Sequence, residues 1–221
     1  DHMLKLEVPL AFKPARSLSE TPYSAVVRPP SAQYEDYPNQ RWVAVEGDGF
    51  CITAANTGSF AHNLTTTSFC LNLMRSPAYS SFNIKPGSRF SDNRFLPRQD
   101  QGEHEVAFRF HFGNSFNERL AFELAAVLNI PPHFQVYFPN RMASKTKKAK
   151  DFSNVFRVNP GNIQIVALKR AEREDVLIIR LQETAGRTTR AELRFAGFRR
   201  RVKTTIKRYA VKTLAVQRKK Q

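Results

Sequence analysis

The side chains that most often do chemistry in proteins are sparse in this sequence and lack catalytic spacing. Its 221 residues include five His, two Cys and 19 acidic residues. No His lies near another His, a Cys or an Asp at the separation typical of zinc ligands, so we predict no metal site. Two carboxylates about 5–10 Å apart across a cleft could hydrolyse a glycoside, but sequence alone does not pair Asp92, Asp100, Glu103 or Glu105. Nucleophile-elbow, P-loop and dinucleotide motifs do not occur, and we predict no complete catalytic site.

The two cysteines, Cys51 and Cys70, fall on equivalent sides of neighbouring predicted strands. Two cysteines are too few for a disulfide framework, and an unpaired Cys is among the most buried residue types. We favour two buried, reduced thiols, and a disulfide between them is the alternative.

The net charge of +16 is concentrated in one part of the chain. Residues 1–138 hold 12 Lys or Arg and 13 Asp or Glu, whereas residues 139–221 hold 23 and 6. Such an excess is typical of nucleic-acid binding, and residues 198–221 carry ten cations and no acid. Apolar residues interleave with these cations as in a strand with one solvated face, without the aromatic platform on which bases stack. A polyanion-binding domain formed by residues 198–221 is therefore a less favoured alternative, and nucleic acid is not the partner we expect. Thermophily or an acidic partner surface explains the charge equally well.

Apolar residues alternate through much of the first 138 residues, which predicts antiparallel strands. Residues 9–40 carry six prolines and no helical period, so extended, irregular chain is expected there. Strands are predicted from Arg41 onward, over 50–55 and over 69–74. The clearest is Glu105–Phe112, with its Phe side chains on one face. This pattern is typical of a sheet with one buried face.

One helix is predicted after a cap at Asn114 or Ser115. Phe116, Leu120 and Leu124 follow at helical spacing, and the prolines after Ile130 end the helix.

The last third of the chain predicts a second β unit. Residues 139–160 are read as a basic, solvated linker or loop. Short strands at regular spacing follow, which is typical of a small antiparallel β-sandwich. They are expected at Ile163–Leu168, Val176–Leu181, Ala191–Phe195 and twice within 200–217. The predicted fold class is all-β with one short helix.

Several motifs follow one another between residues 38 and 187. They are Gln40-Arg41-Trp42-Val43, the hairpin Gly49–Ser59, Leu71-Asn72-Leu73-Met74-Arg75-Ser76-Pro77, Asp100-Gln101-Gly102-Glu103-His104-Glu105, and Val166-Ala167-Leu168-Lys169-Arg170-Ala171-Glu172 with the strand behind it. In order and spacing this series resembles the C-terminal β region of glycoside hydrolase family 38, the zinc-dependent retaining α-mannosidases. The resemblance is to bacterial and archaeal members more than to Golgi or lysosomal ones.

The resemblance implies the following domain organisation. Residues 4–138 are the end of a mutarotase-like β-supersandwich, 139–160 are the linker, and 161–221 are the terminal small β-sandwich. Residues 1–3 are interpreted separately as a cloning remnant outside the fold, because Met3 looks like a start codon behind vector residues. The resemblance also implies that the catalytic Asp nucleophile and the two-His, two-Asp zinc site lie in N-terminal catalytic and helical domains missing from this chain. Strands before Leu4 are then missing too, which predicts an exposed sheet edge or pairing with another chain.

Arg75 is the residue that the resemblance brings nearest to chemistry. The matching Arg of related mannosidases points toward the active-site cleft, where a guanidinium can bind sugar hydroxyls or a carboxylate through two parallel hydrogen bonds. A clamp on an interdomain ion pair is an equally good interpretation. Asn56 and Asp100 are weaker candidates at the rim of the cleft, and as turn residues they could do no more than shape loops. The hairpin at 56–60 departs from the family pattern, so no substrate specificity is carried over.

We therefore expect a noncatalytic part of an α-mannosidase that completes the substrate cleft and supports assembly with the missing domains. Zinc is expected only in the missing catalytic domain. A mannoside is the expected substrate of the parent enzyme, and a homo-oligomer is a further candidate assembly. A cytoplasmic location is expected because no secretory signal or membrane span is visible. The alternative is a carbohydrate-binding module whose platform is Trp42 with Tyr23, Tyr34 and Tyr37, although a buried Trp42 is the preferred interpretation.

Overall fold

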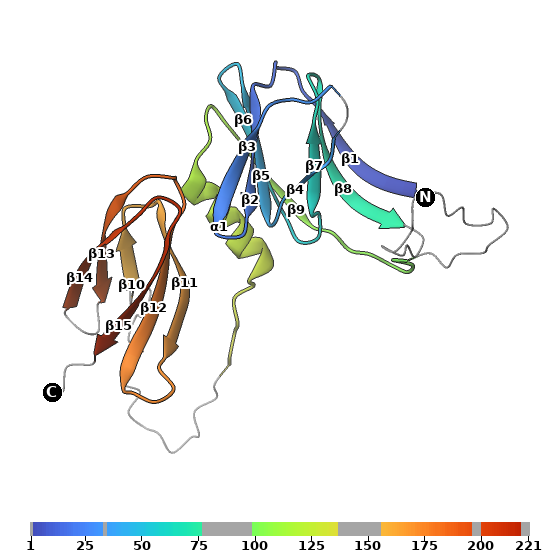
Figure 1. Cartoon of the computed structure of the whole chain (residues 1–221). Helices are drawn as coiled ribbons and strands as arrows, with labels where there is room; N and C mark the ends of the chain where they lie inside the picture. The colour runs from blue at the N-terminus through green and yellow to red at the C-terminus, as the bar shows by residue number, and fades with distance from the viewer. Residues whose placement is uncertain (1, 33–34, 77–98, 137–155, 196–199, 218–221) are drawn as a thin grey trace, which may run out of the picture. The chain divides into compact units, whose positions relative to one another are not determined.

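The computed structural model of the protein describes residues 2–32, 35–76, 99–136, 156–195 and 200–217. Strands predominate in these residues and a single α-helix occurs among them, which confirms the all-β fold class (Figure 1). The chain divides into two compact units. The first is built from residues 1–21, 26–117 and 121–130, and the second mainly from residues 131–221.

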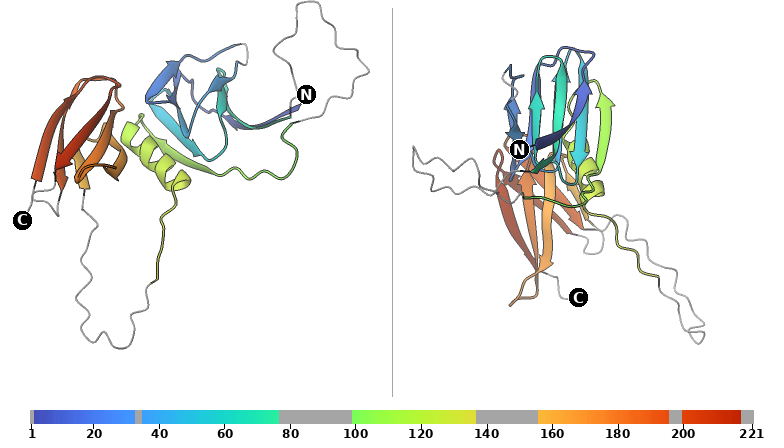
Figure 2. Two further views of the ribbon diagram at one scale, coloured as in Figure 1. Left: turned by 60° about the horizontal axis from the view of Figure 1, so that its bottom comes forward. Right: turned by 90° about the vertical axis from the view of Figure 1, so that its right-hand side faces the viewer.

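The first unit contains two antiparallel sheets, whose strands can be followed in Figure 2. The larger sheet has the order β3-β2-β5-β6-β9 and the smaller has the order β1-β8-β7-β4. The strands of the larger sheet are β2 (Arg16–Thr21), β3 (Ser24–Arg28), β5 (Trp42–Gly47), β6 (Phe50–Asn56) and β9 (Phe108–Gly113). Those of the smaller sheet are β1 (His2–Pro9), β4 (Tyr37–Pro38), β7 (Ala61–Leu64) and β8 (Ser68–Ser76).

The core of the first unit lies between these two sheets. Each sheet contributes three buried apolar residues to this core. They are Val43, Val45 and Ala54 of the larger sheet and Leu64, Phe69 and Leu71 of the smaller sheet. Phe108 and Phe110 of β9 pack against this cluster, and the Phe rings of that strand stack along one face, as the sequence predicted. At the end of β9, however, Phe112 is 70% exposed.

The helix α1 (Glu118–Asn129) packs on the face of the larger sheet that looks away from this core. The predicted helix is confirmed, with its end at Asn129. Its start is later than the predicted cap, and its buried side chains are Ala121, Phe122 and Ala125. Because α1 covers a second face, Trp42–Val45 is a continuous buried run, where the sequence predicted a sheet with only one buried face. In the described part of the chain, no helix is both long and apolar enough to cross a membrane.

Two predictions for the N-terminal region were wrong. Residues 9–40 were expected to be irregular, but β2 and β3 form there, because the prolines flank these strands rather than interrupt them. The assumed cloning remnant also takes part in the fold, since β1 begins at His2 and Met3 pairs with Arg75. Backbone pairing needs no particular side chain, so any extended residues beside an edge strand can lengthen the ladder. β1 is the end strand of its sheet among the described residues.

The second unit contains two three-stranded antiparallel sheets with the orders β10-β13-β14 and β11-β12-β15 (Figure 1). Their strands are β10 (Phe156–Asn159), β11 (Ile163–Arg170), β12 (Val176–Glu183), β13 (Thr189–Phe195), β14 (Arg200–Ile206) and β15 (Val211–Gln217). All the strands predicted after residue 160 are present. Ile163, Ile179, Leu181, Leu193 and Ile206 form the buried core between the sheets.

The predicted linker at 139–160 is only partly testable because residues 137–155 lie outside the described residues. Residues 156–159 form β10, which the sequence placed in the linker. Phe156 and Val158 pack against the core of the second unit. Four residues are too short an alternation to reveal a strand without knowledge of its partner β13.

Candidate functional site

Arg75 lies one residue before the end of β8, and its side chain is exposed. It stands opposite Met3 of β1 in the antiparallel register. Residues 77–98, which follow the strand, lie outside the described residues, and Asp92 falls among them. The surroundings of Arg75 are therefore defined by the end of β8 and by the segment that starts at Gln99.

Hydrogen bonds of Ser76 hold that segment against the end of β8. The Ser76 hydroxyl donates to the carbonyl of Gln99 at 3.2 Å, and the Gln101 side-chain amide donates to the Ser76 oxygen at 2.8 Å. Asp100 lies between these two contacts in the left-handed region, with a φ of 60° that Asp tolerates. The predicted residues Arg75 and Asp100 are thus brought to the same end of β8.

His104 completes this group of polar side chains. Its Nε2 atom donates to the Asp100 carbonyl at 3.1 Å and lies 3.6 Å from a carboxylate oxygen of Asp100. We call Arg75, Ser76, Asp100, Gln101 and His104 the β8-end cluster. A guanidinium, a carboxylate and an imidazole in solvent can bind hydroxyl groups through directed hydrogen bonds. Such an arrangement can position a polyol.

Asn56 is buried at the end of β6, and its side chain is used by the backbone around it. Its amide nitrogen donates to the Gln40 carbonyl at 3.1 Å, and its oxygen accepts from the Ser59 N–H at 2.8 Å. Asn129, at the end of α1, donates to the Asn56 carbonyl at 3.0 Å. These bonds shape the loop, which was one of the two interpretations of Asn56. A role at the rim of a cleft stays a prediction.

Sequence reasoning missed three members of the cluster, namely Ser76, Gln101 and His104. All three lie in the motifs that drew attention to Arg75 and Asp100. The available signal was the polar residues that directly flank those two side chains. Their role nevertheless depends on hydrogen bonds that span 23 and 25 residues of sequence.

The other candidate groups take no part in the cluster. Cys51 on β6 and Cys70 on β8 are both buried and free, which confirms the prediction of two buried thiols. Burial is the main cause that raises the pKa of each thiol above its usual value. No three His, Cys, Asp or Glu side chains of the described residues lie together as metal ligands would. Trp42 is buried and cannot offer its ring to a sugar.

His62, on β7, is a buried titratable group whose pKa is strongly lowered. Its side chain is fully buried, and its Nε2 atom lies 3.2 Å from the Ser17 hydroxyl of β2. The rings of Tyr37 and Phe69 flank it at 6.2 and 6.4 Å. Burial, and then the charge of Arg28, lower its pKa to about 4. His62 is therefore neutral in the folded protein at neutral pH.

This buried imidazole predicts a loss of stability in mild acid. Between pH 6.5 and 4 the unfolded chain binds a proton at residue 62 and the folded chain does not, so protonation favours unfolding. We expect the free energy of unfolding to decrease as the pH is lowered from 6.5 to 4. The total loss should be roughly 3 kcal/mol once the pH is below 4. Urea unfolding at several pH values measures it. His62→Gln should flatten the slope, whereas the exposed control His133→Gln should keep it; equal slopes in both variants would refute the assignment.

Comparison with known proteins identifies the fold. No family model matches the sequence, and no curated protein matches it. Among solved structures, an α-mannosidase from Enterococcus faecalis V583 superposes with a TM-score of 0.70 and 16% identity, over 98% of this chain and 26% of that one. A protein of glycosyl hydrolase family 38 from Enterococcus faecalis superposes with a TM-score of 0.67 and 17% identity, over the same shares.

The chain thus spans about a quarter of the length of the structures it matches. Identities this low establish a common fold and leave open what the chain does. That fold is nevertheless the one that the series of sequence motifs predicted. This chain has the fold that family 38 α-mannosidases use for about a quarter of their length.

Proposed function

We propose that the chain is a noncatalytic part of a retaining, zinc-dependent α-mannosidase of family 38. It completes the substrate cleft of that enzyme with the β8-end cluster and supports assembly with the catalytic and helical domains. The observation that carries the proposal is the similarity of fold over 98% of the chain to an α-mannosidase, together with the motif residues Arg75 and Asp100 at one strand end. The substrate class is then a terminal α-mannoside.

Zinc does not fit the described residues of this chain, because they bring together no set of three His, Cys, Asp or Glu ligands. The metal and the nucleophile belong, in this proposal, to the catalytic domain. The contribution of this chain is to bind and orient the sugar. Arg75 and His104 would donate hydrogen bonds to sugar hydroxyls, and the Asp100 carboxylate would accept them. A cytoplasmic location stays a prediction.

The purified chain is expected to show no mannosidase activity. With zinc added, an aryl α-mannoside should be hydrolysed no faster than in buffer, because the proposal assigns the nucleophile to the catalytic domain. Turnover comparable with that of a full-length family member would refute the proposal. Calorimetric titration with mannose and mannobiose separates the alternative, since clear heat of binding by the isolated chain would favour an independent carbohydrate-binding module.

The role of Arg75 can be tested in a polypeptide that also carries the catalytic domain. There we expect Arg75→Ala to lower kcat/KM for the aryl mannoside by about 100-fold, as for loss of a charged contact to substrate. Zinc content and thermal stability should stay unchanged. Arg180→Ala, which removes an exposed Arg of the second unit, is the matched control and should have no effect. Equal activity of the two variants would remove Arg75 from the cleft.

A further inference from the structure

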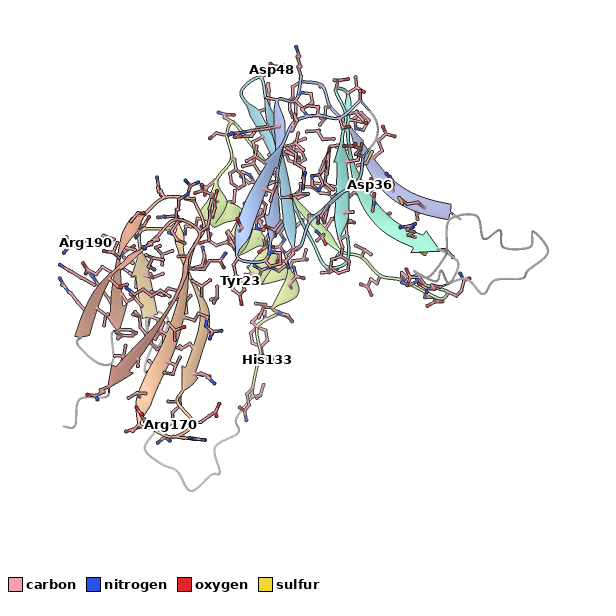
Figure 3. All side chains as sticks on the ribbon, in the orientation of Figure 1. Tyr23, Asp36, Asp48, His133, Arg170 and Arg190 are labelled. Carbon is pink, nitrogen blue, oxygen red and sulfur yellow. The ribbon has the colours of Figure 1, made fainter. Side chains whose placement is uncertain are left out.

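The sheet β10-β13-β14 of the second unit presents a strongly basic outer face. Alternate residues of its strands point inward to the core, among them Val158, Ala191 and Leu193. The side chains between them point outward, and we call these the arginine face. They are Arg157 and Asn159 of β10, Arg190, Glu192 and Arg194 of β13, and Arg201, Lys203 and Thr205 of β14. The face therefore holds five cations and one carboxylate. Figure 3 labels Arg190 on this sheet.

The register of the strands aligns three of these arginines in one row. Arg157 stands directly opposite Arg194, and Arg194 stands directly opposite Arg201. Side chains directly opposite on neighbouring strands have Cβ atoms only about 5 Å apart. All three side chains are exposed. The result is a line of guanidinium groups across the whole width of the sheet.

The row places like charges side by side. Like charges directly opposite on neighbouring strands destabilise a sheet, and the row contains two such pairs. Glu192 is the one acid of the face, and it accepts a hydrogen bond from Arg194 at 2.8 Å and lies 3.9 Å from Arg201. The hydrogen bond from Arg194, followed by the charges of Arg194, Lys203 and Arg201, lowers the pKa of Glu192. One carboxylate leaves the field of the face positive.

We propose that the arginine face binds a carboxylate-rich surface of a partner protein. Four of its five cations are Arg, whose planar guanidinium can bind a carboxylate through two parallel hydrogen bonds. Acidic side chains of a partner would offset the remaining positive charge of the face. The complementary charge would also speed association and select against basic partners. This surface is a property of the second unit and does not depend on the proposed mannosidase role.

The geometry favours an acidic protein over nucleic acid. The outward positions are charged or small and polar, so the face has no aromatic ring on which the bases of a single strand could stack. A three-stranded sheet is also too broad for the major groove of a duplex, which admits a helix or a two-stranded ribbon. A charged sheet face is well suited to another protein surface.

The test uses the full chain and two fluorescent probes, a poly-L-glutamate peptide and an oligo-dT strand of equal charge. At low salt we expect poly-glutamate to bind more tightly than oligo-dT, with an affinity that falls as salt is raised. The triple variant Arg157→Thr, Arg194→Thr, Arg201→Thr should weaken poly-glutamate binding by about tenfold or more. Its melting temperature should change little, because the variant removes two like-charge pairs together with the exposed bond from Arg194 to Glu192, and it keeps a residue favourable in strands.

The matched control removes three cations from the other sheet of the second unit. Lys169→Thr, Arg170→Thr, Arg180→Thr lowers the net charge by the same amount, and Lys169 and Arg170 already have acidic partners in Glu172 and Asp175. The control should change poly-glutamate affinity by less than about twofold. The proposal is overturned if the two triple variants weaken binding equally, if poly-glutamate does not bind at low salt, or if oligo-dT binds more tightly through the same row. If the triple variant unfolds, the single variant Arg201→Glu must show the loss of poly-glutamate affinity.

Discussion

Glu183→Ala is expected to lower the free energy of unfolding of the second unit by about 3–5 kcal/mol. The Glu183 carboxylate is fully buried and accepts four hydrogen bonds. One oxygen accepts from the Asn162 amide and the Ala185 N–H, each at 2.8 Å. The other accepts from the N–H groups of Arg187 at 3.1 Å and Tyr209 at 2.9 Å. Alanine would leave all four donors without this acceptor inside the protein, where an unpaired donor is costly.

The same carboxylate fixes two turns whose backbone is in the left-handed region. Gly186 has a φ of 70° and Tyr209 has a φ of 51°. A Cβ atom at residue 186 would come within 2.5 Å of the Tyr209 hydroxyl, so only glycine fits beneath that ring. Glu183 thus ties the turn after β12 to the turn before β15. Its removal should loosen both turns together.

The single tryptophan makes this prediction measurable. Trp42 lies in the first unit, so its fluorescence reports that unit, whereas far-UV circular dichroism reports both. In Glu183→Ala, a part of the dichroism signal should be lost at lower denaturant, while the fluorescence transition stays in place. Glu183→Gln should have an intermediate effect, because its NH₂ group would face N–H donors. The exposed control Glu172→Ala, also in the second unit, should leave the dichroism transition nearly in place. A similar loss in both Ala variants would contradict the role of Glu183.

Trp42→Ala is expected to lower the free energy of unfolding of the first unit by about 3–5 kcal/mol. The ring is 1% exposed and packs between the larger sheet and the helical segment. Its centroid lies 5.3 Å from the ring of Phe116 and 5.7 Å from that of Phe122 on α1. Truncation would leave a cavity under the helix, where the surrounding strands can relax only partly.

Far-UV dichroism during urea unfolding measures this loss, and hydrogen exchange locates it. Amides of α1 should exchange faster in Trp42→Ala, because Phe122 of the helix loses its ring contact with the sheet. Phe112→Ala is the control, since it removes an aromatic ring from the same sheet at an exposed position. It should cost less than about 1 kcal/mol. Equal costs for the two variants would show that Trp42 does not anchor the helix.

The sequence predicted those elements whose evidence is local. The Phe residues of β9 alternate, and β11–β13 are rich in apolar residues bounded by turns. Strands β11–β13 formed where expected, whereas β9 begins at Phe108 and not at the predicted Glu105. β2, with six residues, and β10, with four, were missed. Such short strands beside prolines or cations give too little periodicity to be recognised. The buried face of α1 was also misjudged. Ala121 and Ala125 lie against the sheet, since small side chains let the helix approach it closely.

For the candidate site, too, the sequence predicted some features and the tertiary structure decided others. Motif resemblance pointed to Arg75, Asp100 and Asn56 as residue types in a familiar order. Residue type and order do not report burial, and Asn56 proved to be enclosed by backbone hydrogen bonds while Arg75 is exposed. The approach of Asp100 to the end of β8 depends on Ser76, whose two partners are 23 and 25 residues away.

The histidines, cysteines and carboxylates of this sequence determine little about its function by their type and spacing alone. From the sequence alone it follows that the chain is mostly β, that its positive charge belongs to its last third, and that no known catalytic spacing occurs. These properties can be read from the sequence because composition and alternation depend only on the order of residues along the chain. The tertiary structure decided which polar residues meet. Strand register placed Arg157, Arg194 and Arg201 in one row, and turn hydrogen bonds placed Asp100 beside Ser76. Both depend on pairing between residues far apart in the chain, which local sequence does not specify.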